Sequence, residues 1–234
     1  KRALNDSHLQ TRVPLSSANS ISLGRLLPQM SYYAKAALDH FRTHDEKLNF
    51  AIPTGNLGNA LACILARKIG LPIGEILLAT NANDVLPRFF DGGDYAPQPS
   101  VSTLANAMDV GAPSNFERLC WLYPDADQLR ASFRTITVDD ATIQSTIREV
   151  WERHQLALCP HTATAIFALD SLALDGSWAV AATAHPAKFE GIVEPLLGTR
   201  IEPPPALAQL LARPSHADPL AADYTALVEA LEAG

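Results

Sequence analysis

A short apolar run that ends in a turn with two glycines constrains this chain more than any other feature. The run covers residues 49–53, residues 54–59 read Thr-Gly-Asn-Leu-Gly-Asn, and residues 60–68 are rich in Ala, Leu and Ile. This order predicts a buried strand, a tight turn and a helix. Glycines allow the backbone to approach an anion closely, and the first N–H groups of a helix favour negative charge. The stretch therefore predicts either a phosphate site or a structural turn with asparagine caps.

The turn differs from two other phosphate loops. No Gly-Lys-Ser/Thr follows it, as a Walker loop requires, and the spacing of Gly55 and Gly58 does not fit the dinucleotide pattern G-x-G-x-x-G. The stretch alone is therefore compatible with several ligands.

Strands alternate with helices along most of the chain, which predicts an α/β fold: a mainly parallel twisted sheet with helices on both faces. The last strand is continuously apolar, as expected for a strand buried on both faces. Residues 1–15 are polar and are then predicted to be extended, and residues 24–41 are predicted to form one helix. The predicted strands are residues 48–53, 75–80, 133–138 and 178–183.

A run of three prolines at 203–205 suggests a stiff linker. We therefore predict an α/β domain over residues 1–200 and a helical segment over residues 201–234. In a parallel sheet, ligands gather beyond the carboxyl ends of the strands, and residues 54–59, 80–84 and 184–188 each follow a predicted strand.

Composition and charge exclude several classes of partner. The formal net charge of −7 argues against nucleic-acid and anionic-membrane partners, and no apolar run is long enough to cross a bilayer. The three cysteines and seven histidines show no metal spacing. We expect a cytoplasmic protein, monomeric or homodimeric, without a metal.

Residues 53–59 resemble the cofactor-phosphate loop of the threonine synthases, which are pyridoxal-phosphate enzymes of fold type II. The resemblance covers about residues 16–189 and rests on five segments together. The other four segments are residues 17–29, 79–85, 102–115 and 160–163.

The resemblance implies pyridoxal 5′-phosphate as the cofactor. Its phosphate would lie on the backbone N–H groups of the loop, with side-chain donors from Asn56 or Asn59. Thr162 matches a family hydroxyl near the pyridine nitrogen; its alternative role is to cap the next helix. The family usually has an aromatic residue at Leu57 and Asp at Cys159. The implied phosphate-loop residues are Gly55, Asn56, Leu57, Gly58 and Asn59.

The resemblance also implies a substrate anion site. Arg25 matches it, because a guanidinium binds phosphoryl and carboxylate groups through paired hydrogen bonds; alternatively it is a surface arginine at a helix start. Asn19 and Ser20 could donate hydrogen bonds beside it.

Further polar residues crowd the loops after the predicted strands. Most are expected in Asx turns and helix caps, although Asp84 and Asp109 could orient site groups. His185 and Lys188 lie where a ligand or a structural role could use them. The crowded residues are Asn81, Asn83, Asp84, Asn106, Asp109 and Asn115.

No lysine of this chain lies in the Phe-Lys-Asp setting that holds the cofactor as a Schiff base in this family. We therefore expect the C-terminal part of an enzyme whose N-terminal part carries that lysine, and expect this chain alone to be inactive. The intact family enzyme is a carbon–oxygen lyase that converts O-phospho-L-homoserine and water to L-threonine and phosphate. The alternatives are another fold-type II activity, such as threonine or serine dehydration, and a non-catalytic domain that binds a phosphate metabolite.

Overall fold

The computed structural model describes residues 2–16 and 19–233. Its four described strands form one parallel sheet in the order β3-β2-β1-β4. The strands are β1 (Leu48–Pro53), β2 (Ile73–Thr80), β3 (Arg134–Thr137) and β4 (Trp178–Val180). The register pairs Phe50 with Ile76 and with Ala179. The predicted parallel sheet is therefore confirmed.

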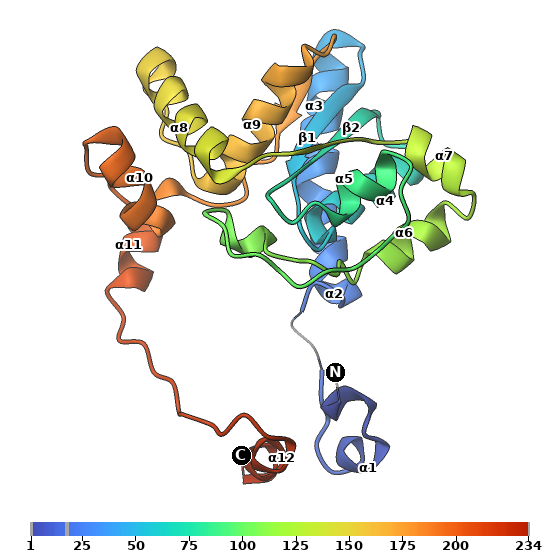
Figure 1. Cartoon of the computed structure of the whole chain (residues 1–234), viewed down its shortest axis with the longest axis vertical. Helices are drawn as coiled ribbons and strands as arrows, with labels where there is room; N and C mark the ends of the chain where they lie inside the picture. Colours follow the sequence, from blue (N-terminus) through green and yellow to red (C-terminus); the bar gives the residue numbers. More distant parts are fainter. Residues whose placement is uncertain (1, 17–18, 234) are drawn as a thin grey trace.

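Helices cover both faces of this sheet (Figure 1). Successive strand residues point to opposite faces. Phe50 and Ile52 belong to the core that includes α4 (Gly58–Lys68) and Tyr33 of α3 (Met30–His44). Ala51 packs on the other face with Ala165 and Ala168 of α9 (Pro160–Leu172), and α8 (Asp140–His154) packs on α9.

Strand β4 differs from its prediction. It has three residues, pairs with β1 alone among the described strands, and is half-buried. Ala182 and Thr183, which were predicted to continue it, are exposed. The prediction of a strand buried on both faces was wrong because β4 lies at the sheet edge, where an apolar sequence does not by itself provide a covering layer.

Two N-terminal predictions also need correction. The segment predicted as one helix over 24–41 is divided into α2 (Leu23–Leu26), a 3₁₀ turn η2 (Leu27–Gln29) and α3. Pro28 lies in the 3₁₀ turn, since proline has no N–H to continue a regular helix. Residues 1–15, predicted as extended, contain η1 (Ala3–Asn5) and α1 (Ser7–Gln10), and the Asp6 side chain caps α1 by accepting from Leu9 N–H.

The remaining elements are short helices and turns that connect the strands and complete the chain. A long loop between α5 and α6, covering residues 91–115, carries the turn η3. In chain order, the remaining helices and 3₁₀ turns are α5 (Val85–Phe90), η3 (Asn106–Met108), α6 (Phe116–Leu122), α7 (Ala126–Ala131), η4 (Pro186–Phe189), α10 (Glu190–Leu197), α11 (Pro205–Leu211) and α12 (Tyr224–Ala233).

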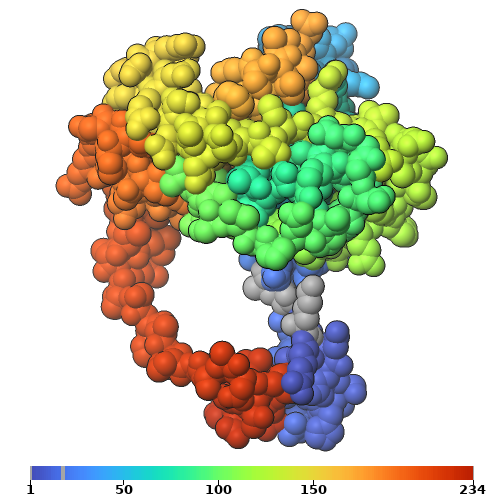
Figure 2. All heavy atoms as spheres, in the orientation of Figure 1, coloured from blue at the N-terminus to red at the C-terminus, as the bar shows by residue number. Residues whose placement is uncertain are grey.

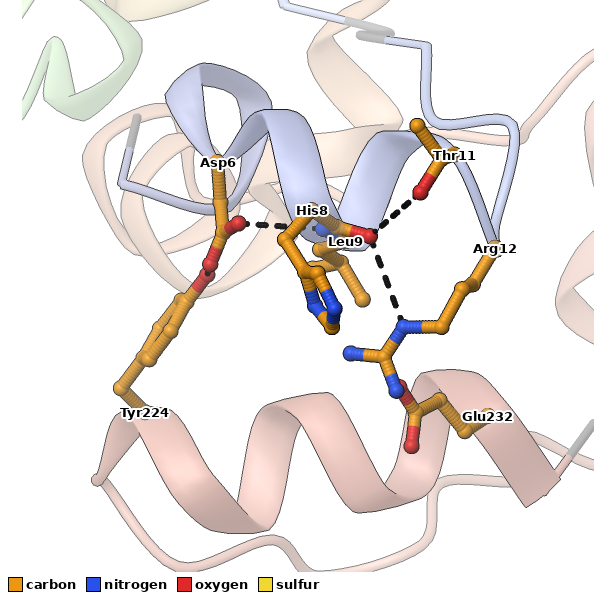
Figure 3. A network of polar contacts seen from close by, with 7 residues as sticks. All are labelled: Asp6, His8, Leu9, Thr11, Arg12, Tyr224 and Glu232. Carbon is orange, nitrogen blue, oxygen red and sulfur yellow. Dashed lines mark hydrogen bonds and ion pairs between the residues drawn. The ribbon is translucent and has the colours of Figure 1, made fainter.

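The two ends of the chain meet away from the sheet, where α12 lies beside α1 (Figure 1). Tyr224 Oη donates to Asp6 Oδ2 at 2.6 Å, and Arg12 pairs with Glu232 at 2.5 Å (Figure 3). The guanidinium of Arg2 lies 3.9 Å from the centre of the Tyr224 ring. We call residues 2–13 together with α12 the terminal unit.

An exposed linker, residues 212–223, connects α11 to α12. Figure 2 shows an opening bounded by this linker, the terminal unit and the large α/β unit. The predicted domain division at residue 200 stays a prediction, and α12 contacts the N-terminal residues rather than standing alone.

Candidate functional site

The glycine turn after β1 has an unusual backbone. Leu57 adopts φ 63° and ψ 5°, in the left-handed region that residues with side chains rarely occupy, and its side chain is fully buried. Helix α4 begins at the next residue, and the Leu57 side chain makes no capping hydrogen bond. The N–H groups at the start of a helix lack intrahelical partners and attract anions, and an anion site at this turn stays a prediction.

The two glycines of the turn are required for close approach. A Cβ placed on Gly55 would lie 2.7 Å from the Cα and the carbonyl oxygen of Met108, and one placed on Gly58 would lie 3.1 Å from Ser20 Cβ. Neither glycine has a positive φ. The positive φ of the turn belongs to Leu57 instead.

The side chain of Asn56 joins three segments. Its Nδ2 donates to Ser20 Oγ at 2.6 Å, and its Oδ1 accepts from the N–H and the hydroxyl of Ser114 at 2.6 and 2.9 Å. Asn59 Nδ2 donates to the carbonyl of Pro53 at 3.2 Å. Both amides thus hold the loop itself, and their donation to a phosphate stays a prediction.

Asn115 and Arg118 form a support that sequence reasoning missed. Asn115 is fully buried, its Nδ2 donates to the carbonyls of Asn56 (2.9 Å) and Ser20 (3.3 Å), and its Oδ1 accepts from Arg118 Nη1 at 2.6 Å. Asn115 precedes α6 but makes no side-chain cap, so it is not one of the helix caps that were expected for most of the crowded polar residues. The only signal in the sequence was the number of asparagines in this loop.

A second buried network holds the loop between α5 and α6 on the end of β2. Asn81 Nδ2 donates to Thr103 Oγ1 and to Asp109 Oδ1, each at 2.8 Å. Thr103 N–H donates to Asp109 Oδ2 at 3.1 Å, and Asn83 Nδ2 donates to the Val101 carbonyl at 2.9 Å. Asp109 therefore anchors its own loop, and the predicted role of orienting site groups stays a prediction.

The predicted substrate residues lie on one side of the turn. Ser20 contacts the phosphate loop through Asn56. Asn19 is exposed and accepts from Ser20 Oγ at 3.2 Å, while Arg25 is exposed on α2. The structure therefore brings Ser20 directly to the turn and presents Arg25 to solvent on the helix that follows.

Thr162 lies in the first turn of α9. The helix begins at Pro160, and its cap is Cys159, whose Sγ accepts from Thr162 N–H at 3.5 Å and lies 3.2 Å from Thr162 Oγ1. The alternative that Thr162 caps this helix was therefore wrong. Both side chains are buried.

His161 is buried beside Thr162, and its ring lies 5.0 Å from the ring of Phe189. Its Nε2 accepts from Ala107 N–H at 3.1 Å. Burial lowers the pKa of His161, the nearby Lys188 lowers it further, and Asp109 raises it. His185 instead caps η4, since its Nδ1 accepts from Ala187 N–H at 3.2 Å.

Two cavities lie at opposite edges of the sheet. One, of about 500 Å³, lies between α3 and β4 near the carboxyl ends of the strands, and Asn59 and Thr183 line it. Thr162 does not line it. A larger one, of about 1350 Å³, opens at the amino ends beside Asn49 and Gly74. Ligands of parallel sheets bind at the carboxyl ends, so the smaller cavity is the one at the expected edge.

No group of three or more His, Cys, Asp or Glu side chains in residues 2–16 and 19–233 could hold a metal ion. In the same residues, no helix combines the length and the apolar character needed to cross a membrane.

Comparison with known families gives two matches. The model of the family described as "Pyridoxal-phosphate dependent enzyme" matches residues 27–183, and the model described as "Threonine synthase, C-terminal" matches residues 162–231.

Similar proteins include the threonine synthase of Escherichia coli (strain K12), 37% identical over 228 residues, which are 97% of this chain and 53% of that protein. That of Serratia marcescens is 38% identical over 209 residues, 89% of this chain and 48% of that protein. This chain spans about half the length of these relatives.

Similar solved structures include the Escherichia coli threonine synthase, with a TM-score of 0.88 over 98% of this chain and 54% of that one. A PLP-bound threonine synthase from Brucella melitensis has a TM-score of 0.87 at 29% identity, over 99% of this chain and 55% of that one.

Proposed function

Because this chain belongs to the family of pyridoxal-phosphate dependent enzymes, whose model matches residues 27–183, we propose that it is part of a threonine synthase. The intact enzyme would convert O-phospho-L-homoserine and water to L-threonine and phosphate. The similarity to threonine synthases over nearly the whole chain supports this proposal, and it confirms the predicted fold class, part of a fold-type II large domain.

The cofactor assignment rests on one observation, the geometry of the turn after β1 at residues 54–59, which we call the cradle. Its backbone is closed so tightly on Met108 that no side chain fits at Gly55. Thr54 Oγ1, at the start of the turn, is buried and has no hydrogen-bond partner among the described residues. Leu57 makes no side-chain cap, although Ala60 N–H donates to Asn59 Oδ1 at 2.8 Å, and the other N–H groups of this helix start next to an unpartnered hydroxyl suit a phosphate group.

The N–H groups of residues 55–59 would hold the cofactor phosphate, and the Thr162 hydroxyl would lie on the pyridine side. When bound, pyridoxal phosphate supplies an electron sink for negative charge that develops on substrate carbons. A neutral hydroxyl at the pyridine nitrogen suits chemistry at more than one carbon. The contact with Cys159 Sγ would orient that hydroxyl.

The segment that holds Ser20 and Arg25 would bind the substrate anion. Ser20 lies against the phosphate loop, and Asn115 fixes its carbonyl. The exposed Arg25 on α2 would then reach a phosphoryl or carboxylate group, with Asn19 and Ser20 as hydrogen-bond donors. The lysine that carries the cofactor aldehyde would come from the other half of the enzyme, and so would the rest of the substrate site.

A chimaera tests the proposal. This chain replaces the corresponding half of the Escherichia coli threonine synthase, and the chimaera is expressed in an E. coli strain that lacks its own enzyme. We expect growth without added threonine, and no growth when the chimaera also carries Gly55→Val. A soluble chimaera that binds pyridoxal phosphate but does not restore growth would contradict the threonine synthase assignment and favour another fold-type II activity.

A further inference from the structure

His161 is a buried titratable residue that the proposed function leaves without a role. It is 3% exposed, and its Nε2 accepts from Ala107 N–H at 3.1 Å. A ring nitrogen that accepts a hydrogen bond carries no proton, so the imidazole is neutral and its proton lies on Nδ1. In the part of the chain that the structure describes, buried Nδ1 has no hydrogen-bond partner.

The surroundings of His161 favour this neutral form. Burial and the charge of Lys188 both disfavour a second proton, and they outweigh the opposing effect of Asp109, so the pKa lies below its ordinary value. The ring therefore remains a hydrogen-bond acceptor at neutral pH.

His161 Nε2 holds the turn η3, which packs against the phosphate loop. Ala107 is the central residue of η3, and its neighbour Met108 is the residue whose backbone leaves no room for a side chain at Gly55. Within η3, Met108 N–H donates to the Ala105 carbonyl at 2.9 Å. The hydrogen bond from Ala107 N–H to His161 Nε2 thus fixes the position of η3 above the loop, while Asp109 accepts from Thr103 N–H and so anchors a residue that precedes η3.

We propose that His161 is a positioning residue for the phosphate loop: it holds η3 against Gly55, so that the N–H groups of residues 55–59 keep one geometry for an oxyanion. This inference rests on the proposed function, because it assumes that the loop binds the cofactor phosphate. His161 acts through Ala107 and Met108 and does not itself touch the ligand.

Two amide variants differ in how far their acceptor reaches. The Oε1 of His161→Gln can take the place of Nε2, whereas the Oδ1 of His161→Asn ends at the position of Nδ1, too short for Ala107. The probe is pyridoxine 5′-phosphate, which carries the phosphate but no aldehyde that could react with lysine. Pyridoxine, without the phosphate, is the control ligand.

Equilibrium dialysis with the 234-residue chain gives the readout. We expect wild type and His161→Gln to bind pyridoxine 5′-phosphate with similar affinity, and His161→Asn to bind it about tenfold more weakly, as the loss of one hydrogen bond predicts. Pyridoxine should bind all three equally weakly. Hydrogen exchange of the Ala107 amide should be faster in His161→Asn alone.

The pH dependence provides a second test that does not depend on the folding of His161→Asn. Protonation of Nε2 prevents His161 from accepting the hydrogen bond of Ala107 N–H. The affinity of wild type for pyridoxine 5′-phosphate, divided by that of His161→Gln, should therefore fall below pH 6.5. Titration of the probe affects both proteins equally and cancels in this ratio. Equal affinities of the two amide variants, or a ratio that does not change with pH, would overturn the role of His161. Wild type that does not prefer the phosphorylated probe would instead overturn the proposed function.

Discussion

The backbone of Met108 lies directly against Gly55, at a distance that excludes even a methyl group: a Cβ on Gly55 would approach Met108 Cα to 2.7 Å. These residues are far apart in sequence, and the contact joins the turn after β1 to the long loop between α5 and α6.

Gly55→Ala should therefore disturb the cradle more than the small size of the added methyl group suggests. Backbone atoms cannot move aside as the end of a side chain can, and overpacking of this kind costs about 1–3 kcal/mol. We expect the affinity for pyridoxine 5′-phosphate to fall about tenfold or more, and the melting temperature to fall as well. The matched control is Gly191→Ala in α10, where an added Cβ meets nothing within 4 Å. An unchanged affinity in Gly55→Ala would contradict the close contact.

Leu57 provides a prediction about stability. Leu57→Ala removes a buried side chain and should lower the free energy of unfolding by about 2–5 kcal/mol. Leu57→Gly removes the same side chain but also relieves the left-handed backbone, which costs other residues about 1–2 kcal/mol. We expect the Gly variant to be the more stable of the two in urea unfolding, the reverse of the order that Ala and Gly show inside a helix. Greater stability of the Ala variant would show that the left-handed conformation is not strained.

The buried imidazole makes stability depend on pH. Because the pKa of His161 lies below 6.5 in the folded chain, the unfolded chain binds this proton more readily as the pH falls. The free energy of unfolding of wild type should therefore decrease, relative to that of His161→Gln, as the pH falls from about 7 to about 5. Above about pH 7 the difference should be constant. Urea unfolding of both proteins across this range measures it, and parallel curves would contradict the prediction.

The local stability of the terminal unit should depend on the hydroxyl of Tyr224. Tyr224→Phe removes the hydrogen bond to Asp6 and keeps the ring beside Arg2. We expect faster hydrogen exchange in residues 3–12 and unchanged exchange in the sheet. Tyr32→Phe, which removes an exposed hydroxyl from α3, is the control and should leave residues 3–12 unaffected. Faster exchange in β1 after Tyr224→Phe would show that the two units unfold together.

The last prediction concerns the lysines. No lysine of this chain has the sequence setting expected for cofactor attachment, so treatment with pyridoxal phosphate and borohydride should label several lysines weakly, without threonine formation from O-phospho-L-homoserine. Peptide mapping distinguishes the outcomes. Strong labelling of one lysine together with turnover would show that the catalytic amine lies in this chain.

The sequence allowed the sheet to be predicted because apolar runs and glycine turns are local signals. Residues 48–53 formed the expected strand, and the turn at 55–59 opened the expected helix. The exposure of β4 could not be predicted in the same way. An apolar run shows which residues can be buried, but it does not show whether another element lies beside them.

The supports of the candidate site escaped prediction for a related reason. Asn115 is bonded to residues 59 and 95 positions away, and His161 to a residue 54 positions away. No spacing rule links such positions, so each looked like a surface turn residue or a motif neighbour. The cap of α9 comes from Cys159 rather than from Thr162, because the helix already begins at Pro160.

The exposed linker before α12 has a consequence for how the two ends of the chain stay together. Residues 212–223 are exposed and form no helix or strand, so we expect them to act as a flexible tether, and a chain of that length keeps its ends within roughly 20 Å of each other on average. Such a tether gives α12 an effective concentration near the N-terminal residues in the millimolar range. The contacts of the terminal unit can therefore be individually weak and still be occupied most of the time, whereas α12 as a separate peptide at micromolar concentration would leave residues 2–13 bare.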